Sequence, residues 1–149
     1  MNLLLTIVTI LCIGLLIGTE FAVSAFINPV LWKLEESAQS QAIRGFALRL
    51  GRAMPFWYAA SFLLLLAETA VHWHAGGAAL LMAASGIWAA VIVLTLVFLV
   101  PINNRMARLD GVSFAATARR EHGRWDARHR MRVAALMAAM ICFLIAVCG

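Results

Sequence analysis

Charged residues are scarce in this chain. Asp, Glu, Lys and Arg make up 13% of its 149 residues, whereas a soluble domain carries about a quarter. Hydrophobic residues make up 64%, which is more than so short a soluble chain can bury. The composition excludes an ordinary soluble enzyme and a disordered chain, and it predicts an integral membrane protein.

Cysteine and the motifs of soluble enzymes are also lacking. The three cysteines, Cys12, Cys142 and Cys148, lie in apolar runs and form no C-x-x-C pair. This pattern is typical of small buried side chains and disfavours a disulfide or a thiolate metal site. The sequence has no P-loop, dinucleotide fingerprint, G-x-S-x-G or H-E-x-x-H motif, so the usual soluble chemistries lack support.

Long apolar stretches dominate what is present. They cover about 3–30, 53–72, 78–100 and 133–148. A helix needs about 20 apolar residues to cross a bilayer, and the fourth stretch gains length from a helical segment that begins near residue 114. We predict one all-α domain over 1–149, an up-down four-helix transmembrane bundle whose fourth helix extends into the cytoplasm.

The connections between these stretches have their own patterns. Apolar residues recur at helical spacing within 31–52, and they predict an interfacial helix that begins near Ser40 and lies on the inner leaflet. Pro29 and Pro101 are expected to end the first and third helices. Pro55 is expected near the start of the second helix.

Positive charge is confined to two segments. All 12 Lys and Arg lie in 31–52 and 101–132. Basic loops face the cytoplasm, so we expect an inner-membrane protein of bacterial type with both termini outside the cytoplasm. The net charge of +5 is explained by these loops, and we expect lipid rather than nucleic acid as the partner.

Small residues form two helical stripes. Gly14 and Gly18 make a G-x-x-x-G motif, and the third stretch carries Ala79, Ala83, Gly86 and Ala90. Such stripes let membrane helices approach closely. They predict close packing within the bundle, with a homodimer face as the alternative.

Glu20 is the most informative polar residue, because an ionisable group within a membrane helix is costly and marks a functional site by default. Ser24 and Asn28 follow it at helical spacing, so a polar stripe runs toward the cytoplasmic end. The second group is His122, Trp125, His129 and Arg132, whose spacings of 3, 4 and 3 place them on one helical face. Together with Asn103 and Asn104, these groups predict a polar pocket at the inner end of the bundle.

A metal site is one alternative for these residues. His122, His129 and Glu20 are of the types that bind zinc, iron or copper, and a single histidine is enough to ligate haem. The two histidines are seven residues apart, about 10 Å along a helix. One ion can take both only if the helix bends.

Three motifs together resemble the anthrone-oxygenase-like family of four-helix membrane proteins. They are Thr19-Glu20 with Asn28-Pro29-Val30-Leu31-Trp32, then Pro101-Ile102-Asn103-Asn104-Arg105, and finally Trp125-x-x-x-His129-x-x-Arg132. The resemblance covers nearly the whole chain. It implies oxygenation of a hydrophobic aromatic, anthrone- or quinone-like molecule, for which no cofactor is required.

The roles implied by this chemistry fall on the pocket residues. Glu20 would be the base, with His122 and His129 as competitors for that role. Arg132 and Asn103 would stabilise an oxyanion, and Trp125 would stack on the substrate. Two alternatives stay open: a metal- or haem-binding membrane protein, and a non-enzymatic partner or transport module.

Overall fold

The protein is a bundle of four long helical segments. The computed structural model describes the backbone of residues 2–108 and 114–149, and the side chains of residues 2–105 and 121–149. The segments, in chain order, are α1 (Leu3–Ala22) with η1 (Val23–Ile27) and α2 (Asn28–Leu31), α3 (Glu36–Val71), α4 (Ala78–Leu94) with η2 (Thr95–Leu99) and α5 (Val100–Arg108), and α6 (Phe114–Cys148). Each contains a stretch long and apolar enough to cross a membrane, so the predicted all-α membrane bundle is confirmed.

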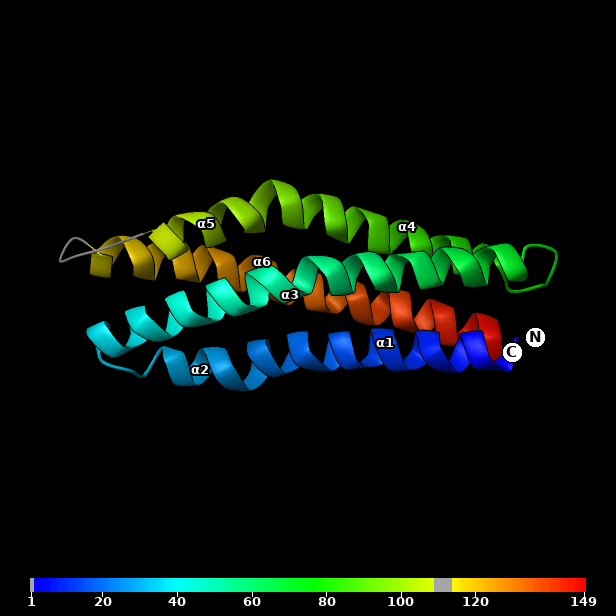
Figure 1. Ribbon diagram of the computed structural model, residues 1–149, viewed down its shortest axis with the longest axis horizontal. Coiled ribbons are helices and arrows are strands. Elements are labelled where there is room, and N and C mark those ends of the chain that lie inside the picture. The colour runs from blue at the N-terminus through cyan, green and yellow to red at the C-terminus, as the bar shows by residue number, and fades with distance from the viewer. Residues whose placement is uncertain (1, 109–113) are drawn as a thin grey trace.

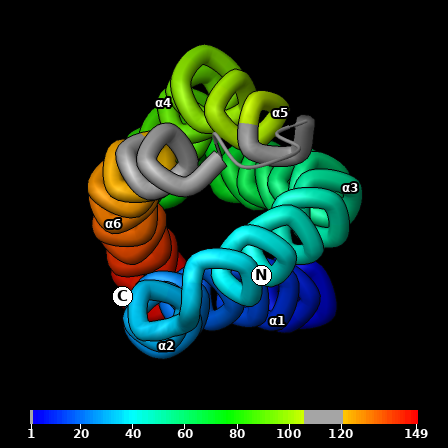
Figure 2. Tube along the Cα trace, turned by 90° about the vertical axis from the view of Figure 1, so that its left-hand side faces the viewer, coloured from blue at the N-terminus to red at the C-terminus, as the bar shows by residue number. Residues whose placement is uncertain are grey.

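The segments run up and down in order around a common axis. Both termini and the turn between α3 and α4 lie at one end of the bundle, and the turn between α2 and α3 lies at the other (Figure 1). Viewed along the axis, α3 and α6 lie on opposite sides, between α1 and α4 (Figure 2). We call the end that holds Trp32 and Arg105 the basic end. The side chains of Arg108, Arg119 and Arg120, which also supported the predicted topology, lie outside the described residues.

Apolar side chains both fill the bundle and cover it. The core contains Leu16, Leu81, Trp88, Leu136 and Phe143, each with no accessible surface. Other large apolar side chains point outward, and their positions on every segment fit contact with lipid acyl chains rather than water. The buried polar residues of the bundle interior therefore lie among helices whose outer faces are apolar.

Two prolines lie within helices that the sequence predicts to end there. The helix containing Pro29 continues to Leu31, and the helix containing Pro101 continues through α5. A π-helical turn precedes each proline by two residues, and the backbone N–H of Asn28 bonds to the carbonyl of Val23 across five residues. A wider turn accommodates the hydrogen bond that proline cannot make. The helix end expected at Pro101 is therefore wrong, whereas the first helical segment ends at Leu31, close to the end expected at Pro29.

The segment 36–52 is helical, but it is the first half of α3 rather than a separate helix on the membrane surface. Its buried residue Ile43 packs against Leu31 and Ile102. The apolar face predicted to enter lipid is thus used inside the bundle, against α2 and α5. Pro55 consequently lies in the interior of a 36-residue helix instead of at its start.

The small-residue stripes do not pack the bundle. A Cβ atom added at Gly14, Gly18 or Gly86 would meet no heavy atom within 4 Å, and the alanine stripe of α4 is exposed. The interpretation as internal packing is therefore wrong, and the homodimer face stays a prediction. The close approach occurs at Gly77, where an added Cβ would lie 2.6 Å from the carbonyl oxygen of Ala146.

Candidate functional site

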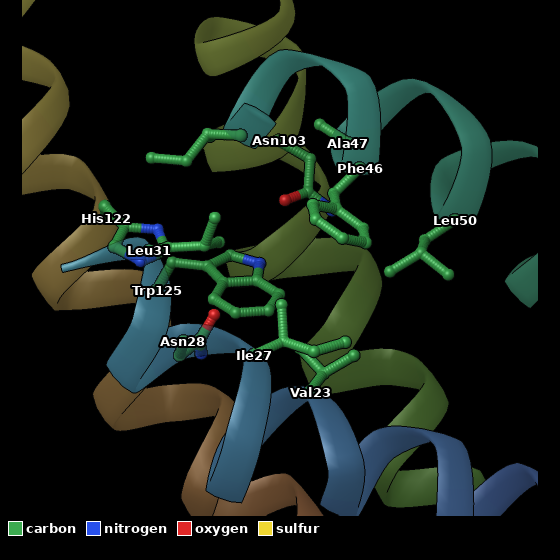
Figure 3. Close-up of a pocket in the computed structure, with 11 residues that line it drawn as sticks. Val23, Ile27, Asn28, Leu31, Phe46, Ala47, Leu50, Asn103, His122 and Trp125 are labelled. Atoms are coloured by element: carbon green, nitrogen blue, oxygen red, sulfur yellow. The ribbon is translucent and has the colours of Figure 1, made fainter. Parts of the chain in front are cut away.

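Two neighbouring cavities in the basic half of the bundle are lined by most of the predicted polar residues, and a third, of about 360 Å³, lies beside Thr95, Arg128 and Arg132. The main cavity has a volume of about 280 Å³, and its polar lining includes Glu20, Tyr58, Thr95, His129 and Arg132. The small cavity, of about 50 Å³, lies among side chains of η1, α2, α3, α5 and α6 (Figure 3). Val23, Leu50, Asn103 and Trp125 line both cavities. The main cavity approaches the size of small-molecule sites, which begin at about 300 Å³.

Glu20 is the centre of a buried polar network in the main cavity. Its side chain is almost wholly buried, and it comes from α1. The Tyr58 hydroxyl donates to Oε1 at 2.9 Å, and Arg132 Nη2 donates to Oε2 at 2.6 Å. A buried carboxylate needs such partners, because leaving it without them is very costly. Residues 20, 58 and 132 are thereby joined across α1, α3 and α6.

His129 completes this network. Its Nε2 lies 3.1 Å from the carbonyl oxygen of Glu20, and since that oxygen only accepts, Nε2 carries a proton. Its Nδ1 lies 2.9 Å from Arg132 Nη2 and 3.2 Å from Glu20 Oε2. Nδ1 is then an acceptor in the neutral ring, placed beside a carboxylate oxygen. The Glu20 and His129 side chains together offer one position for an additional proton.

Arg132 retains further donor capacity. Its Nη1 is 3.5 Å from Thr95 Oγ1, and its guanidinium carbon lies 5.5 Å from the centroid of the Tyr58 ring. Its Nε is buried without a hydrogen-bond partner among the described residues. Because an unpaired buried N–H is rare, this donor is the one group of the network whose partner the described residues do not supply.

Trp125 lies between the two predicted histidines. Its ring stacks on His129 at a centroid distance of 4.5 Å and on His122 at 6.0 Å. Both faces of the indole are therefore covered, and it offers a ligand its edge rather than a face. The prediction that Trp125 stacks on a substrate needs this correction.

His122 lies apart from the Glu20 network. It lines the small cavity, and its ring lies 4.8 Å from that of Trp32. Because the Trp125 ring separates His122 from His129, the two cannot bind one ion. In the described part of the chain, no three His, Cys, Asp or Glu side chains are placed to hold a metal ion, so the suggested set of His122, His129 and Glu20 does not come together as ligands.

Asn28 is hydrogen-bonded to a carboxylate of α6. Its Nδ2 donates to Asp126 Oδ1 at 2.7 Å, and Asp126 Oδ2 accepts from Arg130 at 2.6 Å. Asp126 is itself buried. The contact joins α2 to α6 directly beside the small cavity.

The other predicted polar residues divide into two groups. Asn103 lines both cavities. Ser24 and Asn104, although both are described, lie outside the sets that line them, and Asn104 is exposed. The π-helical turn explains why Ser24 does not line a cavity. Such a turn aligns Val23, instead of Ser24, with Asn28 and so places Val23 on the inward face.

Sequence reasoning missed Tyr58 and Thr95. Tyr58 is the only tyrosine of the chain, and a hydroxyl within an apolar helix needs a buried partner. The presence of Tyr58 in an apolar helix therefore indicated a buried hydrogen bond, but the sequence did not identify the partner. Thr95 was not detectable, because threonine in a membrane helix commonly bonds to its own backbone, as Thr69 does.

A further buried carboxyl group, besides Glu20 and Asp126, lies near the opposite end of the bundle. Glu68 has no accessible surface, and His72 Nδ1 lies 3.0 Å from its backbone carbonyl oxygen and 3.2 Å from its Oε2. Glu68 belongs to neither cavity of the basic half. It therefore provides a comparison for Glu20.

A comparison with known families decides where this architecture belongs. The family model described as anthrone oxygenase matches residues 45–142, well over half of the chain. The chain belongs to the anthrone oxygenase family. The match includes Tyr58, Trp125, His129 and Arg132, while Glu20 and Asn28 precede it. No curated protein and no solved structure matches the chain. The family named from the three motifs is confirmed. The second and third motifs lie within the match, and the first, at residues 19–32, precedes it.

Proposed function

We propose that this member of the anthrone oxygenase family oxygenates a hydrophobic, anthrone-like aromatic substrate to the corresponding quinone. The observation that carries the proposal is the Glu20–His129 pair, which has one proton position and faces a cavity of about 280 Å³. A buried base of this kind suits removal of a proton from carbon. The surrounding apolar helices suit a substrate that is dissolved in the bilayer.

The proposed reaction balances without a redox cofactor. The base removes one proton from the methylene carbon between the two aromatic rings, and an enolate forms. Transfer of electrons from the enolate to dioxygen, followed by carbon–oxygen bond formation and return of the proton, produces a hydroperoxide. Loss of the second methylene proton then cleaves the oxygen–oxygen bond and releases water. Anthrone and dioxygen thus become anthraquinone and water.

The residues of the polar network have different roles in the proposed reaction. Glu20 and His129 hold the proton between the two deprotonation steps. The unpartnered Nε of Arg132 and the Asn103 amide are suited to stabilise the enolate oxygen. Tyr58 is a positioning residue, because its hydroxyl holds the orientation of the Glu20 carboxylate.

Isotope labelling tests this function. Purified protein in lipid nanodiscs is incubated with anthrone under ¹⁸O₂, and the quinone is analysed by mass spectrometry. We expect one ¹⁸O atom per quinone and consumption of one dioxygen per anthrone, well above a protein-free control. A rate no higher than in empty nanodiscs contradicts the proposal, and quinone oxygen derived from water contradicts the route.

The wall of the main cavity offers a test of substrate access. Gly51 lines this cavity, and a Cβ added there meets nothing within 4 Å. We expect Gly51→Leu to fold normally and to reduce kcat/KM for anthrone by roughly ten- to hundred-fold, because a filled cavity excludes the substrate. Gly45→Leu is the matched control, since Gly45 has equally open surroundings on α3 but does not line the cavity. Equal kinetics of the two variants would place the substrate elsewhere.

The membrane orientation is part of the same proposal. Both basic segments lie at the end of the bundle that contains the cavities. Lys and Arg are enriched in cytoplasmic loops. We therefore assign the site to the cytoplasmic half of an inner membrane, with the termini on the other side. A hydrophobic substrate would reach it laterally from the inner leaflet.

A further inference from the structure

The small cavity has polar atoms that the proposed reaction does not use. His122 is 3% exposed, and neither of its ring nitrogens has a hydrogen-bond partner among the described residues. Trp125 Nε1 is likewise buried without a partner there. Buried donors and acceptors are nearly always paired with protein, water or ligand. Two adjacent unpaired side chains therefore point to an occupant of this cavity.

The size and lining of the small cavity restrict that occupant. A water molecule needs about 10–15 Å³ of such volume, and the cavity has about 50 Å³. It has room for one polar substituent but not for an aromatic ring. Most of its wall is apolar, with side chains such as Ile27, Leu31 and Ile43. Its polar lining residues are Asn28, Asn103, His122 and Trp125, and of these only His122 and Trp125 have buried side-chain nitrogens without a partner among the described residues.

The position of Trp125 connects the small cavity to the main cavity. Its indole lines the small cavity (Figure 3) and also the main cavity, as does Asn103. Because His122 and His129 cover its faces, the indole edge, with its N–H group, is what remains for a ligand. A molecule in the main cavity can thus extend a substituent past this edge toward His122.

We propose that the small cavity is a second subsite that binds an oxygen substituent, a phenolic hydroxyl or ring carbonyl, of the aromatic molecule held in the main cavity. This inference rests on the proposed function for the class of molecule. Trp125 Nε1 donates to the substituent oxygen. The His122 ring donates through one nitrogen and accepts through the other, so a hydroxyl group satisfies it best. These two residues would then determine which substituted substrates are preferred.

Equilibrium binding tests this subsite without turnover. The probes are 2-hydroxyanthraquinone and unsubstituted anthraquinone, titrated into the full-length protein in nanodiscs and followed by quenching of tryptophan fluorescence. We expect the hydroxylated probe to bind about ten-fold more tightly, as one or two buried hydrogen bonds allow. In His122→Phe, this preference should disappear while the affinity for anthraquinone stays unchanged. In Trp125→Phe, where the indole also lines the main cavity, the ratio of the two affinities should fall to about one.

His74→Phe is the matched control, because His74 is exposed near the opposite end of the bundle. A preference that survives in both cavity variants, or an equal loss of affinity for both probes, would overturn the subsite and indicate that the cavity holds only water or supports packing. Loss of this preference with no turnover of anthrone would support the subsite and refute the oxygenase. Failure of both probes to bind the unmodified protein would refute the subsite, and turnover measured separately would decide the oxygenase.

Discussion

Glu20→Gln is expected to reduce anthrone oxygenation by about 10²- to 10⁴-fold, which is the usual contribution of a general base. Glutamine keeps the shape of the side chain, and its amide oxygen can still accept from Tyr58 or Arg132. It removes the negative charge and the proton-accepting oxygen beside His129 Nδ1, which lies 3.2 Å away in the unmodified protein. The loss should therefore appear in kcat, with little change in the helical content of the protein.

Glu68→Gln is the matched control for this prediction. Glu68 is also a buried glutamate in a membrane-spanning helix, but it lies outside the main cavity. We expect its variant to retain the full rate in the same aerobic assay, read as quinone absorbance. Retention of more than a tenth of the rate in Glu20→Gln, or equal losses in both variants, would argue against Glu20 as the base.

Arg132→Gln is expected to lower the free energy of unfolding by about 3–5 kcal/mol, the usual result of removing one partner of a buried ion pair. The Arg132 side chain is only 11% exposed and lies 2.6 Å from Glu20 Oε2. Without it, the Glu20 carboxylate is left in an apolar bundle with no cation beside it. Unfolding by titration with SDS in bicelles measures the change.

The double variant Glu20→Gln/Arg132→Gln separates stability from catalysis. Two neutral amides can bond to each other, so most of the lost stability should return, and the two substitutions should be strongly non-additive. Oxygenation should stay absent, because the base is missing. Arg124→Gln is the control on the same helix, and its exposed pair with Glu121 should contribute only about 0–1 kcal/mol. Additive losses in the double variant would show that Arg132 does not act through Glu20.

Helical spacing predicts which residues share one face of a helix, and that part of the candidate site could be predicted from the sequence. The spacing of 125, 129 and 132 placed these residues on one side of α6, and the cost of a charge in a membrane marked Glu20. Spacing does not identify partners on other helices, so the Tyr58 hydroxyl and the Asn28–Asp126 contact appeared only with the fold. Spacing also failed at the prolines, because a π-helical turn changes which residue faces inward.

The sequence by itself determined that this protein is a four-helix membrane bundle of the anthrone oxygenase family. Apolar length suffices for the bundle, because the bilayer permits few alternatives, whereas the family resemblance was carried by the three motifs. Only the tertiary structure decided how the polar residues divide between two cavities. His129 joins Glu20 and Arg132, whereas His122, on the same helical face, lies beyond the Trp125 ring. That division depends on which helices pack together, and a pattern along one helix does not contain this information.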